Sequence, residues 1–233
     1  MTRIIKDPEK ITYYQDTYPY KLQALLNPEG YYVILKNRRR NHILLLEENL
    51  SDDILCNKSK YVILHLGIVD CAPRLFGYFE DRIIHVFMKV PFLRFFTGLF
   101  IKFKSKYRRF FTRYFPKVYT KKKEFKEKYQ FILDEIKRAV GPKKVFIVNI
   151  AETNEENKFR SYNFEKNIAD YNEILKEIVS ENKEFCELVD FHSATKQNKN
   201  FILDEGIHLS NAGHDLLSRL LYEKIQKADR EFK

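Results

Sequence analysis

The chain has 233 residues, with 42 Lys and Arg against 32 Asp and Glu, and a formal net charge of +10. Its length suits a single α/β domain with a substantial buried core. Its three scattered cysteines form no CxxC pair, which excludes a disulfide framework and a cysteine metal site and favours a reducing cytoplasm. The charged N-terminus, MTRIIKDPEK, has no apolar h-region, so we expect no signal peptide.

Predicted helices and strands alternate along the chain. The segment 16–26, DTYPYKLQALL, is predicted as a helix that begins at a proline. Short β-rich runs typical of buried parallel strands lie at 31–36, 61–66, 145–150 and 187–191. Helices with one apolar face are predicted at 122–140, at 164–179 and in the C-terminal segment. This alternation predicts a parallel sheet with helices on both faces and with ligands outside the carboxyl ends of the strands.

The excess positive charge is confined to one aromatic region. Lys102–Lys126 contains eleven Lys and Arg and one Glu, a balance of +10 that equals the net charge of the whole chain. The overlapping segment Pro91–Pro116 interleaves ten Phe and Tyr residues with these bases. Its longest uncharged run, Phe95–Ile101, is far shorter than the ~20 residues that a membrane span needs.

Two interpretations of this region stay open. As a helix, residues 91–126 would form a basic amphipathic surface for an anionic membrane, a polyanionic glycan carrier or another subunit. Alternatively, the region is a helical insertion that packs its aromatic side chains on the core and exposes its bases to solvent. We expect no nucleic-acid partner, because no nucleic-acid-binding motif accompanies the charge.

The strongest chemical signal is the segment 202–221, ILDEGIHLSNAGHDLLSRLL. Glu205 lies three residues before His208, so in a tight loop its carboxylate, or that of neighbouring Asp204, can hold one imidazole nitrogen and leave the other facing a substrate. This is the acid–base half of a hydrolytic triad; the alternative is a structural hydrogen-bonded pair. His214, six residues after His208, does not suit a metal pair on one helix face, so we expect no metal and no cofactor.

The segment Tyr61–Arg74, YVILHLGIVDCAPR, together with 16–26 and the C-terminal loop, resembles the SGNH (GDSL-type) hydrolases, especially the branch encoded beside polysaccharide-biosynthesis genes. The resemblance runs from about Tyr13 to Leu221. It implies a three-layer flavodoxin-like parallel sheet in one domain, 1–233, with a helical insertion at about 79–120. It also implies that His208 belongs to a serine-based triad.

The same resemblance suggests residues that contact substrate. Gly67 to Asp70 follow a predicted strand and are expected at the rim that His208 also reaches. Asp70 is either a turn cap or a substrate contact. Arg74 either pairs with Asp70 or binds an acidic sugar.

The chain departs from the family pattern at several positions. The apolar strand and Gly-Asp-Ser motif that supply the nucleophile are not found ahead of MTRIIKDPEK. Either Met1 is an internal methionine, or Thr2–Lys6 is a shortened first strand with Asp7-Pro8 in place of Asp-Ser. The usual oxyanion-hole Asn is Val69, which has no side-chain donor. The block 37–41, NRRRN, lacks the usual Gly, and Glu205 stands where the family has Asp.

Two functions from different classes therefore remain open. The first is an O-acyl esterase or acyltransferase acting on an acylated glycan or a lipid-linked saccharide, inactive in the form that starts at Met1 because the serine is missing. The second is a non-catalytic relative that binds a glycan or a biosynthetic partner. In both, we expect a cytoplasmic protein, peripheral at the inner face of the membrane if residues 91–126 bind lipid. The sequence does not identify the acyl group or the oligomeric state.

Overall fold

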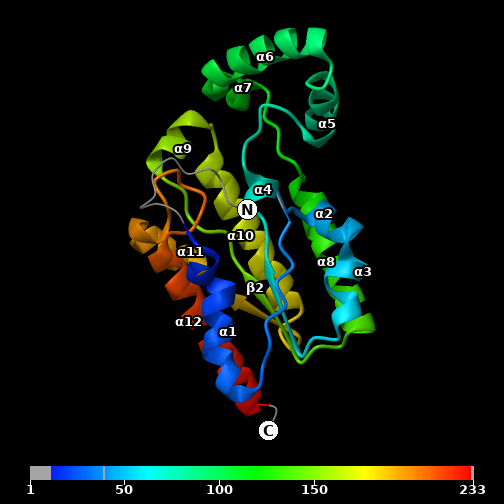
Figure 1. Ribbon diagram of the computed structural model, residues 1–233, viewed down its shortest axis with the longest axis vertical. Helices are drawn as coiled ribbons and strands as arrows, with labels where there is room; N and C mark the ends of the chain where they lie inside the picture. Colours follow the sequence, from blue (N-terminus) through cyan, green and yellow to red (C-terminus); the bar gives the residue numbers. More distant parts are fainter. Residues whose placement is uncertain (1–11, 39, 232–233) are drawn as a thin grey trace.

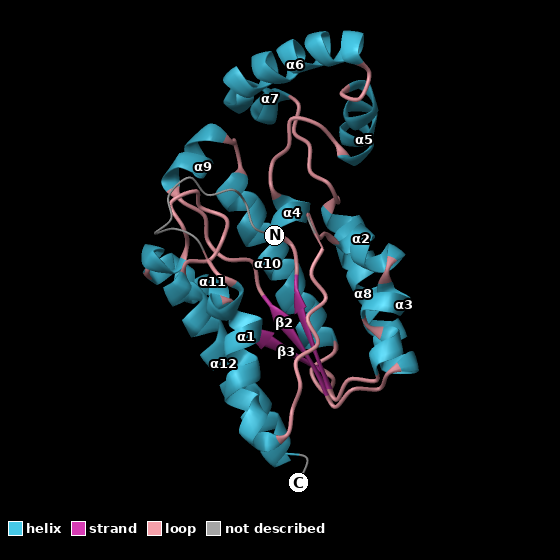
Figure 2. Cartoon of the chain, in the orientation of Figure 1, coloured by secondary structure: helices cyan, strands magenta, loops and turns pink. Residues whose placement is uncertain are grey.

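The computed structural model describes residues 12–38 and 40–231. Its centre is a parallel three-stranded sheet in the order β1-β2-β3, formed by β1 (Tyr61–His65), β2 (Lys144–Val148) and β3 (Cys186–Val189). In the register of the sheet, Ile63 lies opposite Phe146, which lies opposite Glu187. Figure 2 shows the strands lying side by side between the helices. Since β2 pairs on both sides, it is the most buried strand.

Helices cover both faces of the sheet, as Figure 1 shows. Alternate side chains of β2 point to opposite faces, as the pleat requires. Val145 and Ile147 belong to the core that contains residues of α8 (Lys122–Ala139) and α10 (Phe164–Glu181). Phe146 and Val148 belong to a second core, which contains residues of α1 (Tyr18–Leu26) and α12 (Asn211–Glu231). The result is the expected three-layer α/β fold.

Shorter elements connect these layers. They are the helices α2 (Ile43–Glu48), α3 (Leu50–Asp53), α4 (Ile68–Cys71), α9 (Glu155–Arg160) and α11 (Phe191–Gln197), and 3-10 turns at Tyr14–Asp16, Asn27–Glu29, Leu55–Asn57 and Lys199–Phe201. The predicted strands at 61–66, 145–150 and 187–191 and the helices at 122–140 and 164–179 are confirmed, with ends that differ by one or two residues.

The predicted strand at 31–36 is wrong. The segment has no strand assignment, and Tyr32 and Ile34 are 87% and 57% exposed. The side chain of Gln23 donates a hydrogen bond to the Tyr31 carbonyl oxygen (2.9 Å) and accepts one from the Val33 backbone N–H. A β-strand needs an adjacent strand with which to exchange backbone hydrogen bonds. Among the described residues, no strand pairs with this segment.

Three helices form an arm, residues 78–115, that projects beyond the end of the sheet (Figure 1). They are α5 (Tyr78–Phe87), α6 (Pro91–Lys106) and α7 (Arg108–Tyr114). Neither α5 nor α6 has a buried residue. The interpretation in which these aromatic side chains pack on the core is therefore wrong. Within 12–38 and 40–231, no helix is long and apolar enough to cross a membrane.

Candidate active site

The segment that precedes α12 is a tight loop held by backbone hydrogen bonds. Ile202 and Leu209 form an antiparallel bridge, and the Leu203 N–H donates to the His208 carbonyl oxygen (2.8 Å). Gly206 turns the chain with a left-handed φ of 77°. This turn brings the side chain of Glu205 back over His208.

Glu205 contacts His208 twice. Its Oε1 accepts a hydrogen bond from the His208 backbone N–H (2.7 Å) and makes a short hydrogen bond with ring atom Nδ1. The second ring nitrogen, Nε2, has no hydrogen-bond partner within the part of the chain that the structure describes. Asp204 uses its carbonyl oxygen to accept a hydrogen bond from Asn154. Glu205 is therefore the carboxylate that contacts the imidazole of His208.

Residues near the start of α9 fix this loop from outside. Asn157 donates a hydrogen bond to the Glu205 carbonyl oxygen, and Thr153 Oγ1 donates to that of Gly206, both at 2.7 Å. Asn154 caps α9 by accepting from the Asn157 N–H (2.9 Å) and also contacts the loop. The sequence analysis missed these residues, although three amide or hydroxyl side chains between five and nine residues after the end of β2 were a usable signal.

Gly67 and His208 line the same cleft, a cavity of about 1260 Å³. Its other walls come from residues 31–38 and from the whole of β1. Because β1 pairs with β2 alone among the described strands, its other edge faces this cavity. The cleft therefore combines a predicted reactive histidine with an unpaired strand edge.

Both the backbone conformation and the packing at position 67 require a glycine. Its φ is 120°, and a Cβ there would lie 2.6 Å from the Ile150 side chain. Val69 also lines the cleft but offers no side-chain donor. Of the three residues expected to contact substrate, only Gly67 lines the cleft.

Asp70, for which a turn cap and a substrate contact were both open, is not among the residues that line the cleft. It is fully buried, and its Oδ1 accepts hydrogen bonds from the Ile43 N–H (3.1 Å) and from Thr120 Oγ1 (2.7 Å). These contacts connect α4 with α2 and with the segment that leads into α8. Burial raises the pKa of its carboxyl to about 6. The buried carboxylate of Asp70 thus connects segments of the fold.

Arg74 also lies outside the cleft. It donates a hydrogen bond to the Val69 carbonyl oxygen (3.1 Å), and its guanidinium lies 4.5 Å from the centre of the Tyr119 ring. It forms no ion pair with Asp70, and burial lowers its pKa. Packing against an aromatic ring accounts for its position.

Asn37, Arg38, Arg40 and Asn41 line the cleft, and none of them is a glycine. Arg38 holds Asp53 with two hydrogen bonds of 2.8 and 2.9 Å. Arg40 has a φ of 56°, a left-handed conformation that costs a non-glycine residue roughly 1–2 kcal/mol. The chain therefore keeps a glycine-like backbone here with an arginine side chain that pairs with Asp81 (2.7 Å).

Two further histidines lie on the wall of the cleft. Tyr18 donates its backbone N–H to His214 Nδ1 (3.2 Å), and its hydroxyl lies 3.4 Å from His65 Nδ1. Burial lowers the pKa of both imidazoles to about 4. Both are therefore neutral at physiological pH and add no charge to the cleft.

This histidine pair predicts acid sensitivity. The pKa of each imidazole is 6.5 in the unfolded chain and about 4 in the folded chain. Between these values the unfolded state binds more protons, so stability falls as the pH falls. Asp70, with its raised pKa, partly offsets this loss below pH 6. We expect the free energy of unfolding to drop by about 3 kcal/mol from pH 7 to pH 4.5.

Urea denaturation followed by circular dichroism at pH 7.0, 6.0, 5.0 and 4.5 measures this dependence. A His214→Gln variant removes one of the two titrating groups and is expected to show a flatter profile. A wild-type profile that rises toward pH 4.5 would contradict the assignment of two neutral buried histidines.

Among the described residues, no side-chain nucleophile contacts His208. Within the part of the chain that the structure describes, no serine, threonine or cysteine side chain bonds to its imidazole. The serine and threonine side chains that line the cavity are Thr12, Thr17 and Ser59. The alternative that places Asp7-Pro8 at the family's Asp-Ser position lies outside the described residues. The same described residues contain no group of three His, Cys, Asp or Glu that could hold a metal ion.

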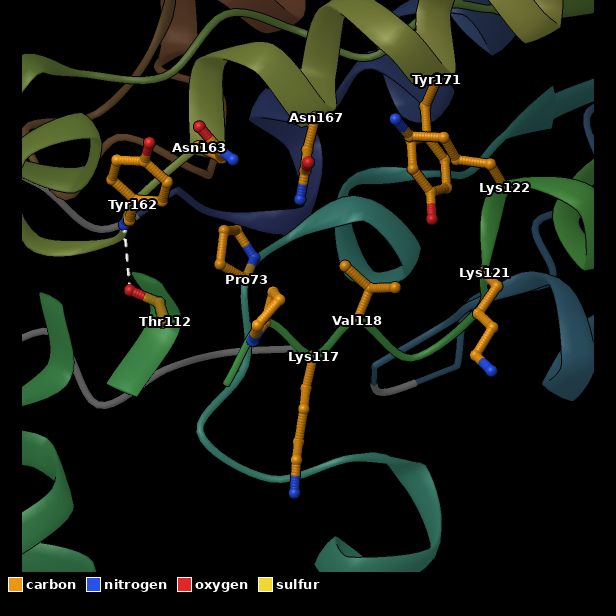
Figure 3. A pocket seen from close by; sticks show the side chains of 11 residues that line it. Pro73, Thr112, Lys117, Val118, Lys121, Lys122, Tyr162, Asn163, Asn167 and Tyr171 are labelled. Atoms are coloured by element: carbon orange, nitrogen blue, oxygen red, sulfur yellow. Dashed lines mark hydrogen bonds between the residues drawn. The ribbon is translucent and has the colours of Figure 1, made fainter. Parts of the chain in front are cut away.

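A second, smaller pocket of about 190 Å³ lies where the arm joins the body. Figure 3 shows Lys117 and Lys121 pointing away from Tyr171, and Thr112 accepting a hydrogen bond from the Tyr162 N–H (3.0 Å). Neither His208 nor Gly67 lines it. We interpret this pocket as a packing gap at the junction between the arm and α10.

The family model for the GDSL-like lipase/acylhydrolase family matches residues 11–216, which is most of the chain. The chain belongs to this family. None of the curated proteins matches the sequence.

Among solved structures, the acetylxylan esterase Axe2 from Geobacillus stearothermophilus superposes with a TM-score of 0.61 at 19% identity, covering 90% of this chain and 80% of Axe2. The acetyl xylan esterase AlAXEase gives 0.61 at 16% identity, covering 91% of both chains. Catalytic mutants of Axe2 with alanine in place of a serine, an aspartate or a histidine align equally well. At these identities the likeness concerns the fold.

Proposed function

We propose that this protein is an SGNH-type O-acyl esterase that acts on an acylated glycan. The observation that carries the proposal is the Glu205–His208 pair, fixed by two hydrogen bonds at the mouth of a cleft beside the end of β1. Family membership and the fold shared with two acetyl xylan esterases support an ester of a sugar as substrate. The polysaccharide-biosynthesis setting and a lipid-linked acceptor are finer parts of the same proposal.

The chemistry follows the family pattern. A serine Oγ attacks the acyl carbonyl carbon while His208 Nε2 takes the hydroxyl proton, and Glu205 stabilises the imidazolium through Nδ1. The intermediate then expels the sugar oxygen, which receives that proton. A water molecule cleaves the acyl-serine by the same route and releases the acid. If a second sugar hydroxyl replaces water, the reaction becomes acyl transfer.

The shape of the cleft favours one position for the catalytic serine, beside the free edge of β1. The unpaired edge of β1 and residues 31–38 leave room for an additional strand, and parallel strands carry catalytic groups at their carboxyl ends. A serine at the end of a strand in this position would stand on the rim that also holds Gly67. With Val69 in place of Asn, the oxyanion would depend on backbone N–H donors.

One observation favours a second candidate, a non-catalytic glycan-binding relative. No hydroxyl or thiol among the described residues reaches His208. In this alternative the same cleft binds sugar without cleaving it. Both candidates treat residues 1–233 as one domain carrying the arm. The free Cys56, Cys71 and Cys186 support a reducing, cytoplasmic compartment.

Esterase assays on two forms of the chain separate the candidates. We expect the 233-residue chain to hydrolyse p-nitrophenyl acetate no faster than its His208→Ala variant, because it offers no serine at the strand end. A form extended at its N-terminus by an apolar strand ending in Gly-Asp-Ser is expected to hydrolyse the ester. Stoichiometric labelling of one serine in the 233-residue chain, lost in a single Ser variant, would contradict this expectation.

A further inference from the structure

The arm exposes an apolar stripe to solvent. On α6 the side chains of Phe92, Phe95, Phe96, Leu99 and Phe103 recur at helical spacing and so share one face. Each of them is between 50% and 74% exposed. In a globular protein such a stripe normally faces the core. Here it faces away from the core.

The neighbouring helices extend this apolar surface. On α5, the side chains of Phe79, Ile83 and Val86 share a face and are 54–76% exposed. On α7, Phe110 and Tyr114 are 53% and 59% exposed. Of the 25 exposed large hydrophobic side chains among the described residues, 15 lie in the arm. Apolar exposure concentrated in this way marks an interaction surface.

The charge of the arm selects the kind of partner. From Arg82 to Lys123 the sequence contains 13 Lys and Arg and no Asp or Glu. Some of these bases hold the arm to the body: Arg108 donates 2.7 Å hydrogen bonds to Ser161 and to the Pro73 carbonyl oxygen. Others remain unpaired. Lys89, Arg94 and Lys102 are exposed and form no ion pair with any described residue.

From this combination we infer that the arm is a docking surface for an anionic lipid bilayer. Its aromatic stripe enters the boundary between headgroups and acyl chains, and the unpaired bases contact the lipid phosphates. Helix α6 has 16 residues and lies in the plane of the membrane surface, in keeping with the absence of a membrane-spanning helix among the described residues. The inference does not depend on the proposed esterase activity.

A second copy of the chain fits this surface less well. Pairing two arms would bring together two stretches that each carry 13 bases and no acid. Like charges face each other in such a dimer and oppose its formation. Anionic lipid supplies the opposite charge together with an apolar phase for the rings.

Vesicle co-sedimentation tests the inference with the full chain. We expect binding to phosphatidylcholine vesicles that contain phosphatidylglycerol, and little binding to phosphatidylcholine alone. Binding should weaken strongly between 50 and 500 mM salt, values chosen to shorten the screening length to a few ångströms. Equal binding to the two vesicle types, or none to either, overturns the inference.

Charge-reversal variants locate the contact. The triple variant Lys89→Glu, Arg94→Glu, Lys102→Glu should lower the partition coefficient by at least about 100-fold, because each basic residue near an anionic surface contributes about fivefold and each new carboxylate is repelled as well. The matched control is Lys58→Glu, Lys183→Glu, Lys196→Glu, which changes the net charge equally at exposed, unpaired lysines on the body. An equal loss in both variants overturns the assignment to the arm.

Fluorescence tests insertion of the stripe itself. The chain contains no tryptophan, so Phe96→Trp introduces a single reporter on α6. Its emission should shift to the blue on anionic vesicles, whereas that of Phe131→Trp, at a 46% exposed position on α8, should not. Binding without a shift at Phe96→Trp, or a dimer in analytical ultracentrifugation that forms through the arm and excludes vesicles, overturns the inference.

Discussion

In a form of the chain that carries the Gly-Asp-Ser strand, Glu205→Gln is expected to lower kcat for p-nitrophenyl acetate by about 10⁴-fold. Glutamine keeps the size of the side chain, but it is neutral and cannot stabilise the imidazolium that forms on His208 during proton transfer. The His208→Ala variant should lose still more, on the order of 10⁶-fold. Because both groups act in the transition state, KM should change little.

Asp204→Asn is the matched control in the same extended form. Its carboxylate is adjacent in sequence, but Glu205 is the residue whose oxygen contacts both the backbone N–H and Nδ1 of His208. We therefore expect Asp204→Asn to keep kcat within about tenfold of the parent, a change of about 1.4 kcal/mol in the barrier, because the carboxylate that contacts Nδ1 stays in place. A loss as large as that of Glu205→Gln would show that Asp204 holds the imidazole during catalysis.

The parts of the fold that sequence could predict are those set by local patterns. Strands β1, β2 and β3 are apolar runs bounded by polar or turn residues, and α8 and α10 repeat apolar side chains every three or four residues. The segment 31–36 has the same local composition as a strand and yet is not one. Strand formation there depends on hydrogen bonds from a neighbour, which no local pattern contains.

In the candidate site, too, local contacts could be predicted from the sequence and long-range contacts could not. The Glu205–His208 pair could be predicted because both residues lie in one short loop. The position of Asp70 could not, because its partners Ile43 and Thr120 lie 27 and 50 residues away. Asn157 could be noticed as a polar residue after β2, but its partner Glu205 could not be predicted, because 48 residues separate the two.

The two helical glycines Gly213 and Gly98 should respond to alanine in opposite directions. Gly213 lies in the first turn of α12, where a Cβ would overlap the Phe201 carbonyl oxygen and lie 2.9 Å from its carbonyl carbon. That carbonyl is held in place, because it accepts a hydrogen bond from the Ser210 N–H (3.0 Å). At Gly98 on α6, a Cβ would meet nothing within 4 Å.

We therefore expect Gly213→Ala to destabilise the protein by about 3 kcal/mol or more, because backbone cannot yield as a side chain can and α12 must move away from the core. Gly98→Ala should instead stabilise it by about 1 kcal/mol, the usual gain from alanine in an exposed helix. Urea denaturation followed by circular dichroism measures both variants against the parent. Since α12 directly follows the His208 loop, the first variant should also weaken the Glu205–His208 pair. A Gly213→Ala variant as stable as the parent would mean that α12 does not pack on Phe201 as described.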